Sequence, residues 1–393
     1  MTQETRHALV IGVGLAGAAV CATLARKGWR ITLLDAASGP SQGASGLPVG
    51  MLSPHVTRSP TPLSRLCDIG VAATRAELQR LVPQGAGWQA CEVDNLQHDP
   101  GRWPAALVRP GALVQAWLGE AARTSGWTAL WGARVHALRK MTAADGSVLW
   151  AAVNAGGQTL AQAPCVVVAG AFGSLALLTE ADAWLPPEAL PLRPVKGQMS
   201  LAALEGAPLA ARPQRQNGVF VPQYEDSGLA PQWPSRIWSM GSTYDRGDPT
   251  THTTEAAHQR NAESLGAMLP AARQAMETAL SAGQLRGWAQ VRCASLDRLP
   301  LAGAVPDVAA MHRAMGTAVA REGLLPMNEV PRWPGLFTLS ALGSRGLTLA
   351  LPMAQRVAEG ITGEPCTLPE DLYRAVDPAR FAWRLARRQP SIR

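Results

Sequence analysis

The sequence lacks the cysteine pattern of a disulfide-rich protein and that of a zinc site. Its six cysteines lie far apart and form no C-x-x-C pair, and its seven histidines show no metal-binding spacing. These absences exclude a small disulfide-linked secreted fold, predict no metal site and favour a reducing cytoplasm.

Charged residues are also few, at 17% of the chain, whereas 47% of the residues are hydrophobic. This composition excludes a disordered or fibrous chain, because it supplies enough apolar side chains for a large core. The length of 393 residues predicts two or three domains. The net charge of +7 favours an anionic partner, and nucleic acid, a dinucleotide or a carboxylate substrate would each fit.

One long apolar run extends from Ala8 to Ala25 and has the length of a membrane span. Three glycines interrupt it, and the polar residues Thr2–Thr5 do not form the cationic start of a signal peptide. We therefore interpret the run as a soluble strand, turn and helix, and predict no membrane partner.

The first 34 residues have the pattern of a β-α-β unit. His7–Ile11 and Arg30–Leu34 are predicted strands, and Leu15–Lys27 is a predicted helix between them. Gly12, Gly14 and Gly17 form G-x-G-x-x-G at the turn, where glycines permit a tight turn, close approach of a pyrophosphate and close helix packing. Asp35 ends the second strand, close to the position about 20 residues after the glycines where a carboxylate that binds ribose hydroxyls is expected. An acidic residue there argues against the 2′-phosphate of NADP.

Later segments alternate between parallel-sheet and antiparallel patterns. Cys165–Ala169 is a continuous apolar run typical of a strand buried on both faces. Residues 186–247 are rich in proline and contain short predicted strands, which we interpret as a separate antiparallel layer. The remaining predicted strands are Val135–Leu138, Val148–Val153, Trp288–Cys293 and Leu336–Ala341, and the remaining helices are Ser64–Leu81, Pro110–Thr124, Thr251–Leu269, Ala271–Ala282 and Gly343–Gly360.

Four further segments have distinctive sequences: Gln-Gly-Ala-Ser-Gly-Leu-Pro-Val-Gly-Met-Leu at 42–52, Pro-Val-Lys-Gly-Gln at 194–198, residues 291–307, and Leu-Gly-Ser-Arg-Gly-Leu at 342–347. Together they resemble the FAD-dependent amine oxidases of the D-amino-acid/glycine oxidase superfamily. In that superfamily the first segment follows the pyrophosphate and flavin, and the last begins a helix beneath the pyrimidine edge of the flavin. The resemblance implies that the cofactor is FAD.

Within this superfamily the chain is most similar to the oxidase half of bifunctional enzymes that modify the wobble uridine of tRNA. The likeness covers nearly the whole chain and is sharpest in the Ala-Ser-Gly loop, in Asp297-Arg-Leu-Pro and in Asp377-Pro-Ala-Arg380-Phe381. Three features depart from that family. No methyltransferase half is expected before Gly12, Leu47 stands where the family tends to have Asn, and Ser53-Pro54-His55 replaces Tyr-Pro-Lys.

The resemblance implies an α/β fold class: a Rossmann-like (glutathione-reductase-type) FAD domain with an inserted antiparallel-sheet α+β substrate domain. The FAD domain is predicted to comprise residues 1–85, 110–192 and 335–393, and it ends in a basic helix. The substrate domain is predicted at 193–290, with an earlier excursion into it at 86–109. Residues 291–306 are expected to return to the FAD domain, and residues 307–334 to form a substrate-side loop.

The glycine motif and the resemblance together assign cofactor-binding residues. Val135 is expected to offer its backbone N–H and C=O to adenine, and Ala169 and Gly170 to line the ADP site, with core packing as the competing interpretation. The full predicted set is Gly12, Gly14, Leu15, Gly17, Asp35, Ala44, Ser45, Gly46, Gly50, Met51, Val135, Ala169, Gly170, Gly343, Ser344, Arg345, Gly346 and Leu347.

Three basic residues are the candidate catalytic residues. The resemblance places Arg292 where the superfamily binds the substrate carboxylate, which a guanidinium grips bidentately; an interdomain salt bridge is the alternative. Arg345 begins a helix beside the expected flavin, where its charge would stabilise the anionic reduced ring, unless it only solvates the helix start. Lys196 would contact flavin or substrate, or is an ordinary surface residue.

The implied reaction is the oxidation of a carboxymethylaminomethyl group on a tRNA wobble uridine. A hydride moves from the N–CH2 carbon to the flavin, and the imine hydrolyses to a primary amine and glyoxylate. The alternative is a free-standing oxidase or dehydrogenase of glycine, sarcosine or D-amino acids. The C-terminal segment forms a basic tail with the arginines Arg374, Arg380, Arg384, Arg387, Arg388 and Arg393. These arginines favour tRNA as the partner, because they could bind phosphates. A solvated helix that packs its apolar side on the protein explains the pattern equally well.

Overall fold

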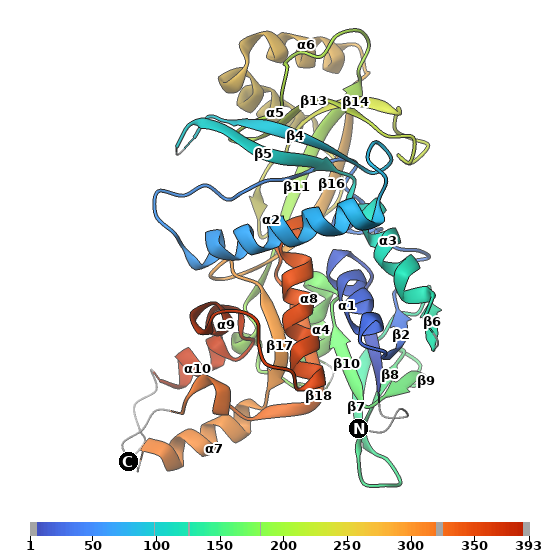
Figure 1. The fold of residues 1–393 in the computed structure, drawn as a ribbon, viewed down its shortest axis with the longest axis vertical. Coiled ribbons are helices and arrows are strands. Elements are labelled where there is room, and N and C mark those ends of the chain that lie inside the picture. Colours follow the sequence, from blue (N-terminus) through green and yellow to red (C-terminus); the bar gives the residue numbers. More distant parts are fainter. Residues whose placement is uncertain (1–5, 98, 125, 181, 320–324, 388–393) are drawn as a thin grey trace.

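A computed structural model describes residues 6–97, 99–124, 126–180, 182–319 and 325–387 (Figure 1). The helices are α1 Leu15–Arg26, α2 Pro62–Leu81, α3 Pro110–Ala122, α4 Ser174–Thr179, α5 Glu255–Met268, α6 Pro270–Ser281, α7 Val308–Val319, α8 Gly346–Thr362, α9 Glu370–Val376 and α10 Arg380–Ala386. The strands are β1 His7–Ile11, β2 Arg30–Leu34, β3 Gly50–Leu52, β4 Trp88–Asn95, β5 Gly101–Val108, β6 Trp127–Leu130, β7 Ala137–Thr142, β8 Val148–Val153, β9 Thr159–Ala163, β10 Cys165–Val168, β11 Leu192–Ala203, β12 Gln214–Gln216, β13 Gly218–Glu225, β14 Arg236–Gly241, β15 Asp245–Arg246, β16 Arg286–Ser295, β17 Leu301–Pro306 and β18 Arg332–Ser340.

The predicted β-α-β unit is the centre of a six-stranded sheet in the order β17-β18-β10-β1-β2-β6. All its neighbours are parallel except β17 and β18. Side chains alternate between two cores along each strand, so Val167 of β10 packs into one core and Val166 and Val168 into the other. The unbroken apolar run at 165–168 therefore does correspond to a strand buried on both faces.

Each face of this sheet has a different cover. Helices α1, α3 and α8 pack against one face, whereas the three-stranded sheet β7-β8-β9 and α4 lie on the other (Figure 1). The carboxyl end of β10 points toward α2 and the second large sheet (Figure 1), and β1 runs parallel to β10. Both strands therefore bring the residues that follow them to the junction between the two sheets.

The second sheet has nine strands and is mostly antiparallel, as the proline-rich sequence of residues 186–247 predicts. It runs β15-β11-β14-β13-β12-β4-β5-β3, and β16 also pairs with β11. Helices α5 and α6 cover its outer face, where Phe220 and Met240 meet Leu265 and Met276 in one buried cluster (Figure 1). Its other face turns toward the parallel sheet.

Three predictions about the chain path need correction. Residues 291–295, expected to have returned to the FAD domain, still pair with β11 in the nine-stranded sheet, and the return is completed by β17. The segment 307–334, expected to be a substrate-side loop, contains helix α7. Met311 of α7 is buried in the core of the parallel sheet. This helix therefore lies at the opposite end of the molecule from α5 and α6 of the substrate domain (Figure 1). Val135 precedes β7, which begins at Ala137.

The long apolar run from Ala8 to Ala25 is divided between β1 and α1, as predicted. None of the helices in the described part of the chain combines the length and the hydropathy of a membrane span.

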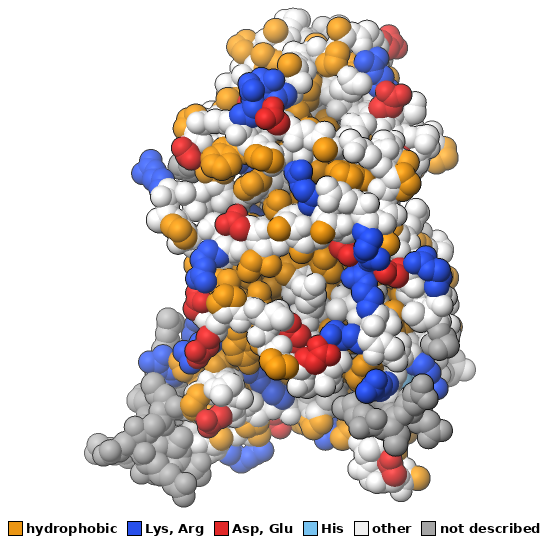
Figure 2. Space-filling model, viewed as in Figure 1, with side chains coloured by type: hydrophobic (Ala, Val, Ile, Leu, Met, Phe, Trp, Pro, Cys, Tyr) orange, Lys and Arg blue, Asp and Glu red, His pale blue; other side chains and the backbone are white. Residues whose placement is uncertain are grey.

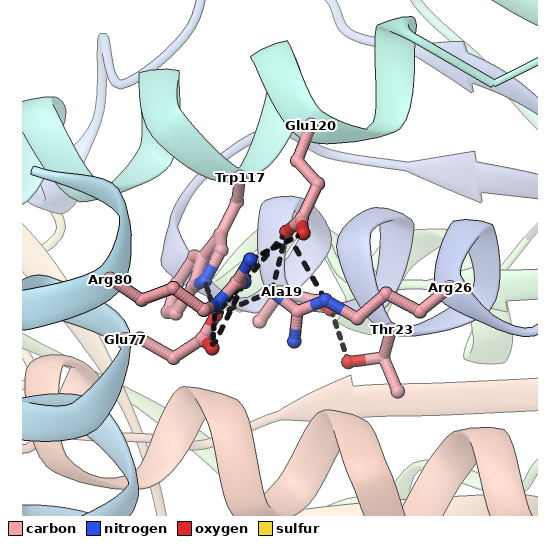
Figure 3. Close-up of polar contacts among 7 residues, drawn as sticks. All are labelled: Ala19, Thr23, Arg26, Glu77, Arg80, Trp117 and Glu120. Atoms are coloured by element: carbon pink, nitrogen blue, oxygen red, sulfur yellow. Dashed lines mark hydrogen bonds and ion pairs between the residues drawn. The ribbon is translucent and has the colours of Figure 1, made fainter.

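A charged cluster joins α1, α2 and α3 (Figure 3). Arg26 and Arg80 both bind Glu77 and Glu120, and the indole of Trp117 donates to Glu77 at 2.7 Å. Burial alone would raise the pKa of Glu120, but hydrogen bonds from Arg80 and Arg26 outweigh it and lower that pKa to about 2. Because a carboxyl with a lowered pKa favours the folded state, this cluster contributes stability above the ordinary pKa of Glu.

We expect Glu120→Gln to reduce the free energy of unfolding at pH 7 by about 1–2 kcal/mol, a value discounted for the partial exposure of its arginine partners. The difference from wild type should be complete above pH about 4.5 and shrink as the pH falls below that value, and it should vanish below pH about 2, where Glu120 is protonated in both states. Urea unfolding of FAD-loaded protein between pH 3 and pH 7 measures it.

Glu370→Gln is the matched control, because Glu370 forms an exposed pair with Arg374 one helical turn away. Its effect should stay below about 0.5 kcal/mol. Equal effects of the two substitutions would show that the three-helix cluster contributes no more than a surface pair.

Candidate active site

A cavity of about 1040 Å³ lies between the two large sheets. The ends of β1 and β10 and the starts of α1 and α8 form one side, and β11 and β16 form the other. Most of the predicted site residues line it, although they come from widely separated segments. They are Gly12, Gly14, Leu15, Asp35, Ala44, Ser45, Gly50, Met51, Ala169, Gly170, Arg292, Gly343, Ser344, Arg345, Gly346 and Leu347.

The turn after β1 depends on close backbone contacts. Gly12 has φ +100°, and a Cβ there would stand 2.7 Å from Cα of Gly170. A Cβ on Gly17 would stand 1.8 Å from the carbonyl oxygen of Gly12. Gly17 is not among the residues that line the cavity. The lack of a side chain there lets α1 begin directly beneath the turn, which is the packing role expected of this glycine.

Two side chains hold this turn in place. The carboxylate of Asp35 accepts backbone hydrogen bonds from Val13 at 2.6 Å and from Ala37 at 2.7 Å. The hydroxyl of Ser45 accepts one from the N–H of Leu15 at 2.9 Å. Asp35 thus fixes the loop at the end of β2, and its contact with a ribose stays a prediction.

This part of the cavity fits the diphosphate of a dinucleotide. Gly14 precedes α1, whose first turn has no acidic side chain, and the unpaired N–H groups of a helix start favour an anion. Gly46 is absent from the cavity wall; a Cβ on it would meet the carbonyl oxygen of Ser41 at 2.4 Å, so it shapes the loop instead. Val135 is absent too and packs against the core, whereas the neighbouring Arg134 lines the cavity.

Arg292 lies on the opposite wall. Its guanidinium sits over Gly197, where a Cβ would come within 2.2 Å of Nη2, and it donates to the hydroxyl of Ser242. Its Cζ is 5.7 Å from the ring of Tyr244. Burial lowers the pKa of Arg292, and among the described residues no carboxylate lies within ion-pair distance of it. The alternative role in an interdomain salt bridge has no acidic partner there.

Lys196 does not reach the cavity, so its prediction as a catalytic residue is wrong. Successive residues of a strand point to opposite faces, and Gly197 takes the cavity face of β11. Lys196 is buried on the other face, where Nζ donates to Thr250 at 3.0 Å and lies 3.4 Å from Asp248. It joins β11 to the chain leading into α5.

Arg345 is the residue before α8 and faces a second, smaller cavity as well as the first. Nη2 lies 3.3 Å from Nδ1 of His55. Burial, together with the charges of Arg345 and Arg215, lowers the pKa of His55 to about 4, so this ring is neutral near pH 7.

Sequence reasoning missed several cavity residues, namely Tyr244, Ser242, Trp288, Gln290 and Arg215. Trp288 and Gln290 were detectable in principle, because they alternate with Arg292 on one face of a predicted strand. Tyr244, Ser242 and Arg215 lie in segments without a motif, and only pairing of distant strands brings them to the site.

The basic tail does not form one exposed arginine face. Arg380 is 1% exposed and binds Asp297 at 2.8 Å, which corrects its predicted place on a phosphate-binding surface. Arg384 pairs with the same carboxylate at 3.1 Å, and Arg387 stacks on Trp383. Arg388 and Arg393 lie outside the described residues. On the face in Figure 2, basic and acidic side chains are interspersed rather than gathered by sign.

Comparison with known proteins identifies the family. The model of the family described as FAD dependent oxidoreductase matches residues 7–109 and 101–360, so the chain belongs to that family. The predicted α/β fold class is confirmed, the protein is an FAD-dependent oxidoreductase, and its cofactor is FAD. The glycine turn, Ser45 and the start of α1 are the residues whose geometry fits this cofactor.

Among its relatives is the tRNA 5-methylaminomethyl-2-thiouridine biosynthesis bifunctional protein MnmC of Verminephrobacter eiseniae, 36% identical over 95% of this chain and 63% of the relative. The protein of that name from Paracidovorax citrulli is 34% identical over 95% of the chain and 60% of its own length. The chain thus spans about three fifths of these relatives. Glycine oxidase from Geobacillus kaustophilus shares the fold, with a TM-score of 0.64 at 16% identity over 94% of this chain and 98% of that one.

We expect Gly14→Ala to weaken FAD binding about tenfold, because the added Cβ would stand 2.8 Å from Oγ of Ser45 and disturb its hydrogen bond to Leu15. FAD fluorescence during titration of the apoprotein measures the affinity. Gly173→Ala is the control, since Gly173 lines the same cavity but has open space around its Cα. Equal affinities in both variants would contradict this role of the loop.

Proposed function

We propose that the protein oxidises the N–CH2 bond of a carboxymethylamino group, and that it does so on a tRNA wobble uridine. The single observation that carries the first part is Arg292, a cavity arginine without a carboxylate partner among the described residues. A partly buried cation of this kind is costly unless a ligand brings the opposite charge. The carboxylate of a carboxymethyl group supplies it and matches the guanidinium fork.

The rigid setting of Arg292 suits a role in positioning. Gly197 leaves room for the guanidinium, and Ser242 and the carbonyl of Thr243, 3.4 Å from Nη1, hold its orientation. A carboxylate gripped there has its α-carbon and nitrogen at a fixed place in the cavity. Bound FAD supplies the acceptor for the two electrons and one hydrogen that leave this carbon.

The cavity walls also favour the reactive form of the amine. Met51, Met199, Val221 and Trp288 line it with apolar groups. A poorly solvated amine loses its proton more readily, and only the neutral amine can give up a hydride. The substrate imine that results adds water and splits into a primary amine and glyoxylate, which balances the reaction.

Assignment of tRNA as the substrate rests on the relatives. Both named bifunctional proteins belong by name to the biosynthesis of a modified tRNA uridine, and their likeness extends over 95% of this chain. Methylaminomethyl-2-thiouridine carries an amine at the position where the proposed reaction would leave one. The net charge of +7 suits a polyanionic substrate.

If Arg292 holds the substrate carboxylate, Arg292→Ala should lose roughly 3–5 kcal/mol of transition-state binding, seen in kcat/KM for the carboxymethylamino substrate. Arg292→Lys should recover only part, because the bidentate fork is lost. FAD content should not change. Arg286→Ala, at the exposed end of the same strand, should behave like wild type, and comparable turnover by Arg292→Ala would remove Arg292 from the substrate site.

Undermodified tRNA that carries the carboxymethylaminomethyl group should release glyoxylate, whereas free glycine, sarcosine and D-alanine should be poor substrates. Binding of tRNA should weaken steeply with salt because neutralised phosphates release counterions. Replacing Arg384 and Arg387 with Gln should raise the KM for tRNA and flatten this salt dependence without changing turnover at saturation.

Replacing Arg139 and Lys140 on β7 with Gln removes the same charge from another exposed place and should leave the KM for tRNA unchanged. Absence of tRNA affinity at low salt, together with fast oxidation of a free amino acid, would establish the small-amine oxidase instead. An unchanged KM in the tail variant would separate the tail from tRNA binding.

A further inference from the structure

A smaller cavity of about 330 Å³ adjoins the main one. The chain after β3, α2, the start of α8 and β12 contribute its walls. Arg215 and Arg345 line both cavities, so they stand at the partition between them. The glycine turn and Ser45 line only the main cavity, which means that the diphosphate site and the smaller cavity are separate.

Among the described residues, the guanidinium of Arg215 has only neutral hydrogen-bond partners. It donates to Oγ of Ser53 and the carbonyl of Pro54, both at 2.8 Å, and to Oδ1 of Asn95 at 3.0 Å. Its Nη2 is buried and has no hydrogen-bond partner among the described residues. An oxyanion in this cavity would give that nitrogen the acceptor it lacks.

Arg345 is also without a carboxylate in the described part of the chain, since its neighbour His55 is neutral. Among the described residues, no Asp or Glu lines the smaller cavity. Two other partly buried arginines do have an acidic partner: Arg109 pairs with Asp226, and Arg332 pairs with Asp377. The pKa of Arg215 is lowered by burial and by the charge of Arg345, so two like charges face one polar cavity uncompensated.

We infer that Arg215 and Arg345 form an oxyanion-binding subsite. It receives a phosphate or carboxylate group that the substrate carries at a distance from its oxidised carbon, while Arg292 holds the carboxylate next to that carbon. A guanidinium from β12 and one from the start of α8 suit such a group, because each offers a planar fork of N–H donors. On a tRNA substrate the group would be a backbone phosphate, and on a small amine it would be a second carboxylate.

Inorganic phosphate is the probe, and the FAD-loaded enzyme is titrated with it while the flavin absorbance is followed. We expect Arg215→Gln to weaken phosphate binding at least about tenfold, because one of two charges is lost. Arg212→Gln is the matched control: Arg212 lies on the same segment but outside both cavities and pairs with Asp94 at 3.2 Å. It should bind phosphate like wild type.

Two more variants make the assignment specific. Arg345→Gln should weaken phosphate binding as much as Arg215→Gln does, and it tests the subsite even if loss of the Ser53 and Asn95 contacts impairs folding of the Arg215 variant. Arg292→Gln should retain phosphate affinity within about twofold, since the two sites are distinct. Equal phosphate affinity in wild type and Arg345→Gln, or no phosphate binding by wild type up to about 50 mM, would overturn the proposal.

Competition against turnover separates the two sources of the oxyanion. Uridine 5′-monophosphate and iminodiacetate serve as competing ligands, with uridine and sarcosine as their counterparts lacking the additional anionic group, and turnover is followed by loss of the modified group from the tRNA substrate. Loss of inhibition by the nucleotide alone in Arg215→Gln assigns the subsite to a phosphate, and loss of inhibition by iminodiacetate alone assigns it to a carboxylate. The phosphate titration does not depend on tRNA turnover, so failure of the proposed function and failure of the subsite give different results.

Discussion

The close approach of Gly12 to Gly170, and of Gly17 to Gly12, is the constraint on which the cofactor side of this protein depends. A Cβ on Gly12 or on Gly17 would overlap backbone atoms there, at the carboxyl ends of β1 and β10. The contact sets where α1 begins, and the hydrogen bonds to Asp35 and Ser45 then fix the loops around that point. In open α/β sheets this edge of the strands is where ligands bind, and here the cavity opens there.

The cavity as a whole is lined mainly by positive charge. Of the described residues, four arginines line it, namely Arg134, Arg215, Arg292 and Arg345, together with one carboxylate, Asp35, which accepts hydrogen bonds from backbone N–H groups. Charges outside the cavity form local clusters in places, such as that of Arg26, Arg80, Glu77 and Glu120. Within the cavity, a cofactor and an anionic substrate would balance the positive charge that lines it.

Elements with strong local patterns were predictable, and those decided by distant partners were not. The strands β1, β2 and β10 and the helices α1, α3 and α6 match their predictions closely, because hydrophobic period and turn residues act over short range. The tail was ambiguous because Arg380 and Arg384 look alike in sequence; only the fold brings Asp297 to both and buries one of them. Likewise, nothing local distinguishes Lys196 from a cavity residue until the register of β11 is known.

The sequence by itself determined the dinucleotide turn, its acidic partner and the place of Arg292 on a strand, since spacing and residue type suffice for local geometry. The tertiary structure alone decided which charges remain unpaired. Arg215 comes from a segment without a motif, and β12 must pair with β4 and β13 before it reaches Arg345, which lies 130 residues farther along the chain. Because the interaction between two charges depends on their distance in space, the sequence identifies the charged residues but does not show which of them lie close enough to compensate one another.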